Sequence, residues 1–150
     1  MGPVAVLGAG GQLGSDLCRL LTHRGVPHFP LAHADLDVCQ HEAVARRLAQ
    51  LRPRVVVNAA AFHHVERCEE EPERAFAVNA LAVRNLALVC RELGALLVHI
   101  STDYVFDGEK GAPYIEDDPV SPLNAYGVSK AAGEFFLRAL WPLSLIHISE

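Results

Sequence analysis

The stretch VAVLGAGGQLG, residues 4–14, passes from a short apolar run directly into a cluster of glycines. The run Val4–Leu7 contains no polar residue, which predicts a strand buried on both faces. Beyond the glycines, leucines recur at the spacing of a helix, at positions 13, 17, 20 and 21. The sequence therefore predicts a strand, a glycine turn and a helix, in that order.

The same alternation continues along the chain. We expect further strands at His28–Leu31, Val55–Asn58 and Leu96–Ile100, and helices at His41–Leu51 and Pro72–Leu93. Pro72 is suited to a first helical turn, and Gly94 to the position at which a helix stops. Apolar strands that alternate with helices predict an α/β fold with a Rossmann-like, doubly wound parallel sheet.

Composition narrows the function classes. The chain of 150 residues is 51% hydrophobic and 21% charged, which suits one domain with a buried core. Its apolar runs are shorter than the roughly 20 residues of a membrane span, and no leader-like segment follows Met1, so we expect no membrane partner and a cytoplasmic location. A net charge of −5 without a basic stripe argues against nucleic acid as a partner.

Cysteine spacing argues against a disulfide framework and against a cysteine metal site. The four cysteines are scattered and form no CxxC pair, so we expect reduced, packed thiols and assign no metal ligands. They are Cys18, Cys39, Cys68 and Cys90.

The glycine turn predicts a nucleotide site. Gly8, Gly11 and Gly14 follow the first strand in a GxxGxxG spacing. Glycines let the backbone approach a pyrophosphate, whose charge is favoured by a helix N-terminus beginning near Gln12. A glycine turn can also serve only to pack a helix closely on a strand, but its place between strand and helix favours nucleotide binding.

Two further segments follow predicted strands. In ADLDV, residues 34–38, an acidic side chain can receive ribose hydroxyls or the adenine amine, or can simply cap a turn. Both interpretations stay open for Asp35, and we favour cofactor contact for Asp37. In VVVNAAAF, residues 55–62, the small residues either let a cofactor lie against the backbone or pack a helix.

Hydroxyl groups follow the last predicted strand, in ISTDYVFDG at residues 100–108, and AYGVSK follows at residues 125–130. Tyr126 and Lys130 are four residues apart, so on a helix they share a face. A lysine ammonium beside a phenol lowers the pKa of the phenol, which makes Tyr126 a usable proton donor. Thr102 then completes a site for a carbonyl substrate by hydrogen bonding to its oxygen.

These motifs resemble those of the extended short-chain dehydrogenase/reductases. The resemblance runs from about Val4 to Leu140, and its segments are GAGGQLG, NAAAFHHVERCEEEPERAFAVNA, ISTDYVFDG and PLNAYGVSK. It implies that NADPH or NADH gives hydride to C4 of a dTDP-sugar, dTDP-4-dehydro-L-rhamnose, and so produces dTDP-L-rhamnose for cell-surface polysaccharide.

The resemblance also implies roles for individual residues. Tyr126 stands at the place of the proton donor, Lys130 at that of the residue that holds the nicotinamide ribose and acidifies the tyrosine, and Thr102 at that of an auxiliary hydroxyl. Other residues fall on positions that line the cofactor in the family; they are Gly11, Gln12, Leu13, Asp37, Val38, Ala61, Phe62, His63 and Ile100.

Departures from the family pattern bear on the cofactor and on assembly. The second strand lacks an acidic residue at its tip, and His33 and Arg24 can accommodate a 2′-phosphate, which favours NADPH over NADH. Some family members bind Mg²⁺ between subunits of a homodimer through an acidic residue just after the glycine motif. Asp16 occupies that place with a shorter side chain.

The resemblance also implies how much of the family's full length this chain contains, and it suggests an alternative function. We expect residues 1–142 to be an incomplete NAD(P)-binding domain, truncated before the C-terminal substrate-binding part, and residues 143–150 to be a non-native tail, since Pro142 breaks the preceding helix. The alternative is a non-catalytic nucleotide-binding subunit, similar to the regulatory subunit of methionine adenosyltransferase. The joint presence of Thr102, Tyr126 and Lys130 favours the enzyme.

Overall fold

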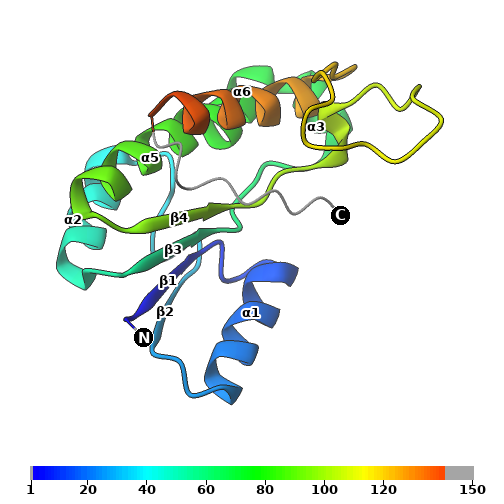
Figure 1. Cartoon of the computed structure of the whole chain (residues 1–150). Helices are drawn as coiled ribbons and strands as arrows, with labels where there is room; N and C mark the ends of the chain where they lie inside the picture. The colour runs from blue at the N-terminus through cyan, green and yellow to red at the C-terminus, as the bar shows by residue number, and fades with distance from the viewer. Residues whose placement is uncertain (1, 141–150) are drawn as a thin grey trace.

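The computed structural model describes residues 2–140 and confirms the predicted α/β fold, a parallel sheet with helices on both faces (Figure 1). The elements in chain order are β1 (Val4–Leu7), α1 (Gln12–His23), β2 (His28–Leu31), α2 (His41–Leu51), β3 (Val55–Asn58), α3 (Val65–Glu70), α4 (Pro72–Phe76), the π-helical turn η1 (Ala77–Leu81), α5 (Ala82–Leu93), β4 (Leu96–His99), the 3₁₀ turn η2 (Asp103–Val105) and α6 (Ala125–Leu140).

The sheet has the strand order β2-β1-β3-β4, and all its strands are parallel. The chain leaves β1 toward one side to form β2 and then crosses back past β1 to form β3. The carboxyl ends of β1 and β3, where Leu7 pairs with Asn58, therefore form the switch point of the sheet. In open α/β sheets this is where ligands bind.

The hydrophobic core lies between the sheet and one layer of helices. Val56 of β3 and Leu97 of β4 point into this core, where they meet Leu48 of α2, Leu86 of α5 and Leu137 of α6. All five side chains are buried from solvent. Figure 1 shows α5 and α6 above the sheet and α1 below it. This packing places α6, with its Tyr-Lys pair, over the carboxyl end of β4.

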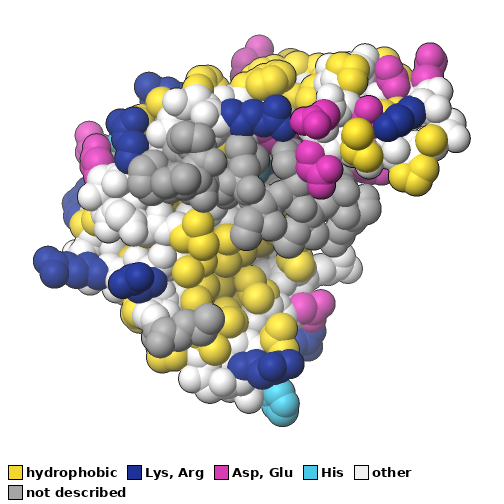
Figure 2. All heavy atoms as spheres, viewed as in Figure 1, with side chains coloured by type: hydrophobic (Ala, Val, Ile, Leu, Met, Phe, Trp, Pro, Cys, Tyr) yellow, Lys and Arg dark blue, Asp and Glu magenta, His cyan; other side chains and the backbone are white. Residues whose placement is uncertain are grey.

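The opposite face of the sheet is covered only in part. Helix α1 covers β1 and β2 on this face. The side chains of Val55, Val57 and Val98, on β3 and β4, point to the same face, where α1 does not cover them, and they are half-buried. Leu96 of β4 is 38% exposed. Figure 2 shows hydrophobic side chains gathered over the strands in this view. This part of the sheet is an exposed apolar surface.

The helix predicted at Pro72–Leu93 differs from the observed one. It is divided into α4, the π turn η1 and α5, and the short α3 precedes it. Pro72 does lie in a first turn, and Gly94 does end α5, with a φ of 65°. The predicted strand at Leu96–Ile100 ends one residue earlier, at His99.

Within residues 2–140, no helix has the length and apolar character to cross a bilayer. The predicted tail at residues 143–150, and Pro142 before it, lie outside the described residues.

Candidate active site

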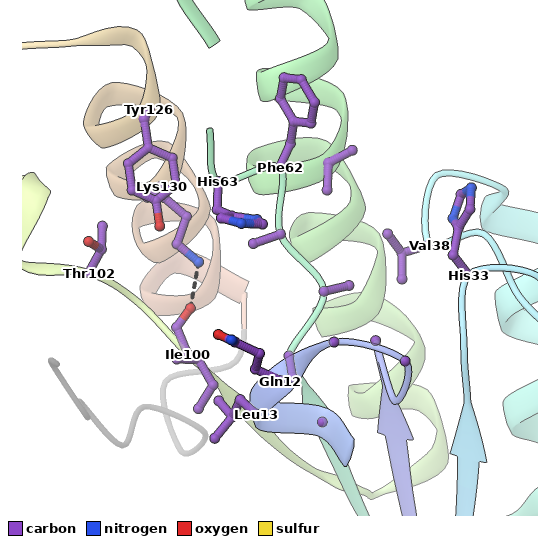
Figure 3. A pocket seen from close by; sticks show the side chains of 18 of the residues that line it. Gln12, Leu13, His33, Val38, Phe62, His63, Ile100, Thr102, Tyr126 and Lys130 are labelled. Atoms are coloured by element: carbon purple, nitrogen blue, oxygen red, sulfur yellow. Dashed lines mark hydrogen bonds between the residues drawn. The ribbon is translucent and has the colours of Figure 1, made fainter. Parts of the chain in front are cut away.

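A cleft of about 1010 Å³ opens at the switch point of the sheet. The glycine turn after β1 and the segment after β3 form its middle. The segment after β2 forms one end, and the segment after β4 together with α6 forms the other end (Figure 3). Fourteen residues that we assigned to catalysis or to the cofactor line this cleft; they are Gly8, Gly11, Gln12, Leu13, Gly14, Asp37, Val38, Ala61, Phe62, His63, Ile100, Thr102, Tyr126 and Lys130.

The glycines of the turn serve two different purposes. Gly8 has a φ of 75°, and a Cβ there would lie 2.7 Å from the backbone nitrogen of Ala60. A Cβ on Gly14 would lie 2.2 Å from the carbonyl oxygen of Gly8. At Gly11, however, a Cβ would meet only that oxygen, at 3.4 Å, and the φ is an ordinary −80°. The fold thus requires Gly8 and Gly14, whereas Gly11 keeps space free at the cleft wall.

The acidic residues after β2 differ in their positions. Asp37 lines the cleft, and one of its oxygens accepts a hydrogen bond from the backbone nitrogen of Cys39 at 2.9 Å. Asp35 accepts from the backbone nitrogen of Ala32 at 2.9 Å and lies outside the lining of the cleft. The turn-capping interpretation therefore holds for Asp35.

The structure corrects the expected place of Arg24. It caps the C-terminus of α1 and precedes β2, so it lies at the amino ends of the strands, opposite the cleft, and cannot meet a ligand there. The arginine that does line the cleft is Arg74 of α4, whose guanidinium lies 4.7 Å from the centre of the Phe62 ring. Asp16 lies on the exposed face of α1, where it forms an ion pair with Arg19. No group of three or more potential metal ligands occurs among the described residues.

Close packing between α6 and η2 assembles the catalytic end of the cleft. The backbone of Gly127 lies so near η2 that a Cβ on it would be 2.2 Å from the carbonyl oxygen of Tyr104. The ring of Tyr104 meets that of Tyr126 edge-on, with centres 5.6 Å apart. Thr102 immediately precedes η2, so this contact brings its side chain to the tyrosine (Figure 3).

The expected acidification of Tyr126 by Lys130 is not observed. Burial raises the pKa of Tyr126, and the hydrogen bond from Thr102 opposes that rise without reversing it. The ammonium does not act on the phenol because the Nζ atom of Lys130 points elsewhere, to the carbonyl oxygen of Ile100, as Figure 3 shows. Desolvation lowers the pKa of Lys130 to about 8, although the nearby carboxylate of Glu134 raises it.

Sequence reasoning missed a set of buried polar side chains behind the cleft. Asn79, in the π turn, donates to the carbonyl oxygen of Phe62 at 2.8 Å and accepts from its backbone nitrogen at 2.9 Å. This pair of bonds fixes the segment after β3, and Asn79 also donates to Ser129 at 3.0 Å. The other members are Asn58, His99, Ser129 and Glu134. One feature of the sequence could have indicated this set: each of two apolar strands ends in one polar residue, Asn58 in β3 and His99 in β4.

The fold and the cleft together define a Rossmann-like domain of the short-chain dehydrogenase/reductase class: a glycine turn at the switch point faces a Tyr-Lys pair on a helix. The family model described as the RmlD substrate binding domain matches residues 2–147, and the chain belongs to this family.

Named relatives agree with this assignment. The chain is 47% identical over 129 residues to a dTDP-4-dehydrorhamnose reductase of Streptomyces griseus, covering 86% of the chain and 42% of the relative. It is 42% identical over 138 residues to the spore coat polysaccharide biosynthesis protein SpsK of Bacillus subtilis, covering 92% and 49%. The chain thus spans about half the length of the curated relatives it matches.

Solved structures show the same fold. A dTDP-4-dehydrorhamnose reductase of Bacillus anthracis, solved in complex with NADP, is 34% identical and superimposes with a TM-score of 0.93, over 99% of this chain and 52% of that one. A UDP-glucose 4-epimerase of Thermus thermophilus, in complex with NAD, is 29% identical with a TM-score of 0.87, over 98% and 53%.

Proposed function

We propose that this chain forms the cofactor-binding half and the proton-donating site of an NAD(P)H-dependent reductase, which converts dTDP-4-dehydro-L-rhamnose to dTDP-L-rhamnose. One observation carries the proposal: Thr102, Tyr126 and Lys130 lie at one end of the same cleft that contains the glycine turn. The names of the relatives support the reaction class, since they include a dTDP-4-dehydrorhamnose reductase and a dTDP-4-keto-6-deoxy-D-glucose reductase.

The residues of the cleft fit a dinucleotide. The lining is continuous from His33 and Asp37 at one end to Tyr126 at the other, which suits an elongated ligand with two nucleoside halves. Midway, the N-terminus of α1 offers backbone N–H groups to a pyrophosphate, and Gly11 leaves room for its close approach. A nicotinamide ring at the α6 end would lie beside the tyrosine and the lysine.

The side chains at that end can carry out the protein's part of a carbonyl reduction. The bound cofactor supplies the hydride to the carbonyl carbon. Tyr126 gives its phenolic proton to the carbonyl oxygen, and the raised pKa of the buried phenol keeps it protonated and able to donate. Thr102 donates a hydrogen bond to the same oxygen as negative charge develops on it. Lys130 faces the cleft from the next turn of α6 and holds the ribose.

The other end of the cleft favours NADPH. Ala32 and His33 stand directly after β2, so the tip of this strand carries no acidic side chain, and His33 lines the cleft. Arg74 lines the same cleft and adds a guanidinium, which pairs well with phosphate. Its present partner is Glu71, at 3.1 Å, an exposed pair that a phosphate can displace.

Three expectations from the family resemblance remain part of this proposal. They are a homodimer, a Mg²⁺ ion between its subunits near Asp16, and a cytoplasmic location, where a diffusible nicotinamide cofactor and a dTDP-sugar are both available. The non-catalytic alternative gains no support from the geometry, because nucleotide binding alone does not need a tyrosine, a lysine and a threonine together at one end of the cleft.

Calorimetric titration of the chain with NADPH and NADH tests the cofactor site. Gly11→Val places a side chain on the cleft wall without straining the backbone, so it should reduce affinity at least about tenfold while the thermal transition stays near that of the wild type. Gln40→Val is the matched control, because Gln40 is the exposed residue that precedes α2, outside the lining of the cleft, with a φ of −87°. Equal binding by wild type and Gly11→Val would refute the assigned site.

Turnover tests the reaction itself. The chain, joined to the carboxyl-terminal half of the Streptomyces griseus relative, should oxidise NADPH in the presence of dTDP-4-dehydro-L-rhamnose, and Tyr126→Phe should slow this by a factor of about 100 or more. Calorimetry measures NADPH binding independently of turnover. Binding of NADPH without turnover in a folded fusion would favour the non-catalytic alternative.

A further inference from the structure

A chain of three buried side chains connects the end of β3 to the catalytic end of the cleft. The Nδ2 atom of Asn58 lies 3.1 Å from Nδ1 of His99, and Nε2 of His99 lies 3.3 Å from Nζ of Lys130. The three side chains are 2%, 4% and 2% exposed. Water therefore cannot replace a poorly matched contact, and donors and acceptors must agree within the chain.

The backbone determines which way the amide of Asn58 faces. Its Oδ1 atom accepts a hydrogen bond from the backbone nitrogen of Ala60 at 3.2 Å, so its Nδ2 atom is the one that faces His99. An amide nitrogen only donates, and Nδ1 of His99 must therefore carry a lone pair. Neutral imidazole then carries its proton on Nε2, the atom that faces Lys130.

A doubly protonated imidazole is excluded by its surroundings. Burial lowers the pKa of His99 well below its usual value, and the adjacent charge of Lys130 lowers it further. His99 therefore presents an N–H group to Nζ. An ammonium at Nζ has only donors, whereas an unprotonated amine has a lone pair that can accept from Nε2. The amine can still donate to the carbonyl oxygen of Ile100.

We propose that His99, fixed by Asn58 with its proton on Nε2, is a positioning residue that favours the unprotonated amine of Lys130 over the ammonium. Asn58 acts one step further back, by determining the tautomer of His99. Two strand-end residues, Asn58 of β3 and His99 of β4, thus control the protonation of Lys130 on α6.

The other ionisable groups around Lys130 are Glu134 and Tyr126, one turn away on either side along α6. Glu134 favours the ammonium, and it accepts a hydrogen bond from Ser101. Cys68 of α3, with Asp103 and Tyr104 of η2, acts on Tyr126 instead. Glu134 and His99 thus oppose each other in setting the charge of Lys130.

The protonation of Lys130 in the ligand-free chain does not depend on the proposed function, but the expected effect of cofactor binding on it does. Ribose hydroxyls and a pyrophosphate accept hydrogen bonds and favour positive charge, so cofactor entry would shift Lys130 toward the ammonium and bind a proton. The protonation equilibrium itself is a property of the ligand-free chain. Its measurement needs neither cofactor nor substrate, so its failure is distinguishable from failure of the proposed reductase activity.

Nuclear magnetic resonance can follow this lysine directly. The 150-residue sequence contains two lysines, Lys110 and Lys130, so ¹³C labelling at lysine Cε gives two signals, which Lys130→Met assigns. Lys110 serves as the internal reference. In the wild type, the ¹⁵N shifts of the His99 ring, assigned by through-bond correlation to the backbone signals of the same residue, should show protonated Nε2 and unprotonated Nδ1. The opposite tautomer would overturn the proposal, whether or not any variant folds.

Two variants test the effect on the lysine. His99→Gln places a side-chain oxygen within reach of Nζ, and Asn58→Asp accepts from both Ala60 and Nδ1–H, which reverses the tautomer. Each should raise the pKa of Lys130 by about one unit or more, without changing that of Lys110. A purely structural role for His99 would leave the pKa of Lys130 unchanged in a folded His99→Gln chain, and that result would also overturn the proposal.

Discussion

Gly127 of α6 packs directly against the backbone of Tyr104 in η2, so that a Cβ at position 127 would lie 2.2 Å from the Tyr104 carbonyl oxygen and 3.0 Å from a side-chain carbon of Pro122. Backbone cannot yield as a flexible side chain can. The glycine between Tyr126 and the following valine therefore determines how near Thr102 comes to the phenol.

Gly127→Ala is expected to force α6 away from η2 and to destabilise the chain by about 1–3 kcal/mol, because the added methyl group overpacks the contact. Thermal and urea unfolding measure the loss. Val128→Ala, at the neighbouring, 40% exposed position, is the control and should change stability by less than about 1 kcal/mol. An unchanged unfolding midpoint for Gly127→Ala would contradict the observed contact.

Cofactor preference is expected to respond to charge at position 33. His33→Asp introduces a carboxylate at the end of the cleft where the 2′-phosphate would lie, so affinity for NADPH should fall about tenfold or more while affinity for NADH changes little. Competition calorimetry at fixed ionic strength gives both constants. His23→Asp makes the same charge change on the exposed end of α1 and should leave the ratio of affinities unaltered. Parallel losses for both nucleotides would remove His33 from the phosphate site.

Stability is expected to depend on pH through Lys130. Its pKa is about 8 in the folded chain against 10.5 for a free side chain, so the unfolded chain binds more protons between these values. The free energy of unfolding contributed by this residue therefore rises from pH 8 to pH 10.5, by about 3 kcal/mol at most. Below pH 8 the full cost of burying the ammonium is present.

Above pH 9 the buried thiol of Cys90 acts in the opposite direction, since burial raises its pKa from 9.0 to about 12 and unfolding then releases protons. The comparison of wild type with Lys130→Met isolates the lysine. The variant should be more stable than the wild type at pH 7, and this advantage should shrink toward pH 10.5. A constant difference across that range would show that Lys130 is not desolvated.

In the fused enzyme, Tyr126→Phe removes the phenolic proton donor and keeps the aromatic ring, so turnover should fall by a factor of about 100 or more while the dissociation constant of NADPH stays within a few fold. Thr102→Val should cost less, because its hydroxyl only assists. Stopped-flow absorbance of NADPH and calorimetry give the two quantities. Near-normal turnover in Tyr126→Phe would disprove its role as the proton donor.

The sequence predicted the strands, the helices α1 and α2, and part of the lining of the cleft, because each depends on a local pattern: an apolar run, helical spacing, or a polar residue after a strand. The segment VERCEE of α3 has little apolar periodicity, so nothing local indicated a helix there. The π turn around Asn79 depends on contacts with Phe62 and Ser129, which lie 17 and 50 residues away.

The electrostatics of the site depended on partners distant in sequence. Asn58 and His99 are 41 residues apart in sequence, and their side chains lie together only because β3 and β4 are neighbours in the sheet. The sequence suggested Arg24 for the 2′-phosphate and did not indicate Arg74, whereas the structure has Arg24 at the C-terminus of α1 and Arg74 in the lining of the cleft. Helical spacing correctly brought Lys130 to the same wall as Tyr126, but spacing cannot show that Nζ would bind the carbonyl oxygen of Ile100 instead of acting on the phenol.

The switch point between β1 and β3 has a consequence for biosynthesis. Among residues 2–140, those that line the cleft all fall from Gly8 to Lys130, at the ends of strands β1 to β4 and on the neighbouring helices. A nascent chain that has emerged from the ribosome as far as Leu140 would thus already carry these lining residues of the proposed nucleotide site. If the proposed site binds a dinucleotide, the ligand would stabilise the sheet at that stage and act as a folding ligand for the growing polypeptide.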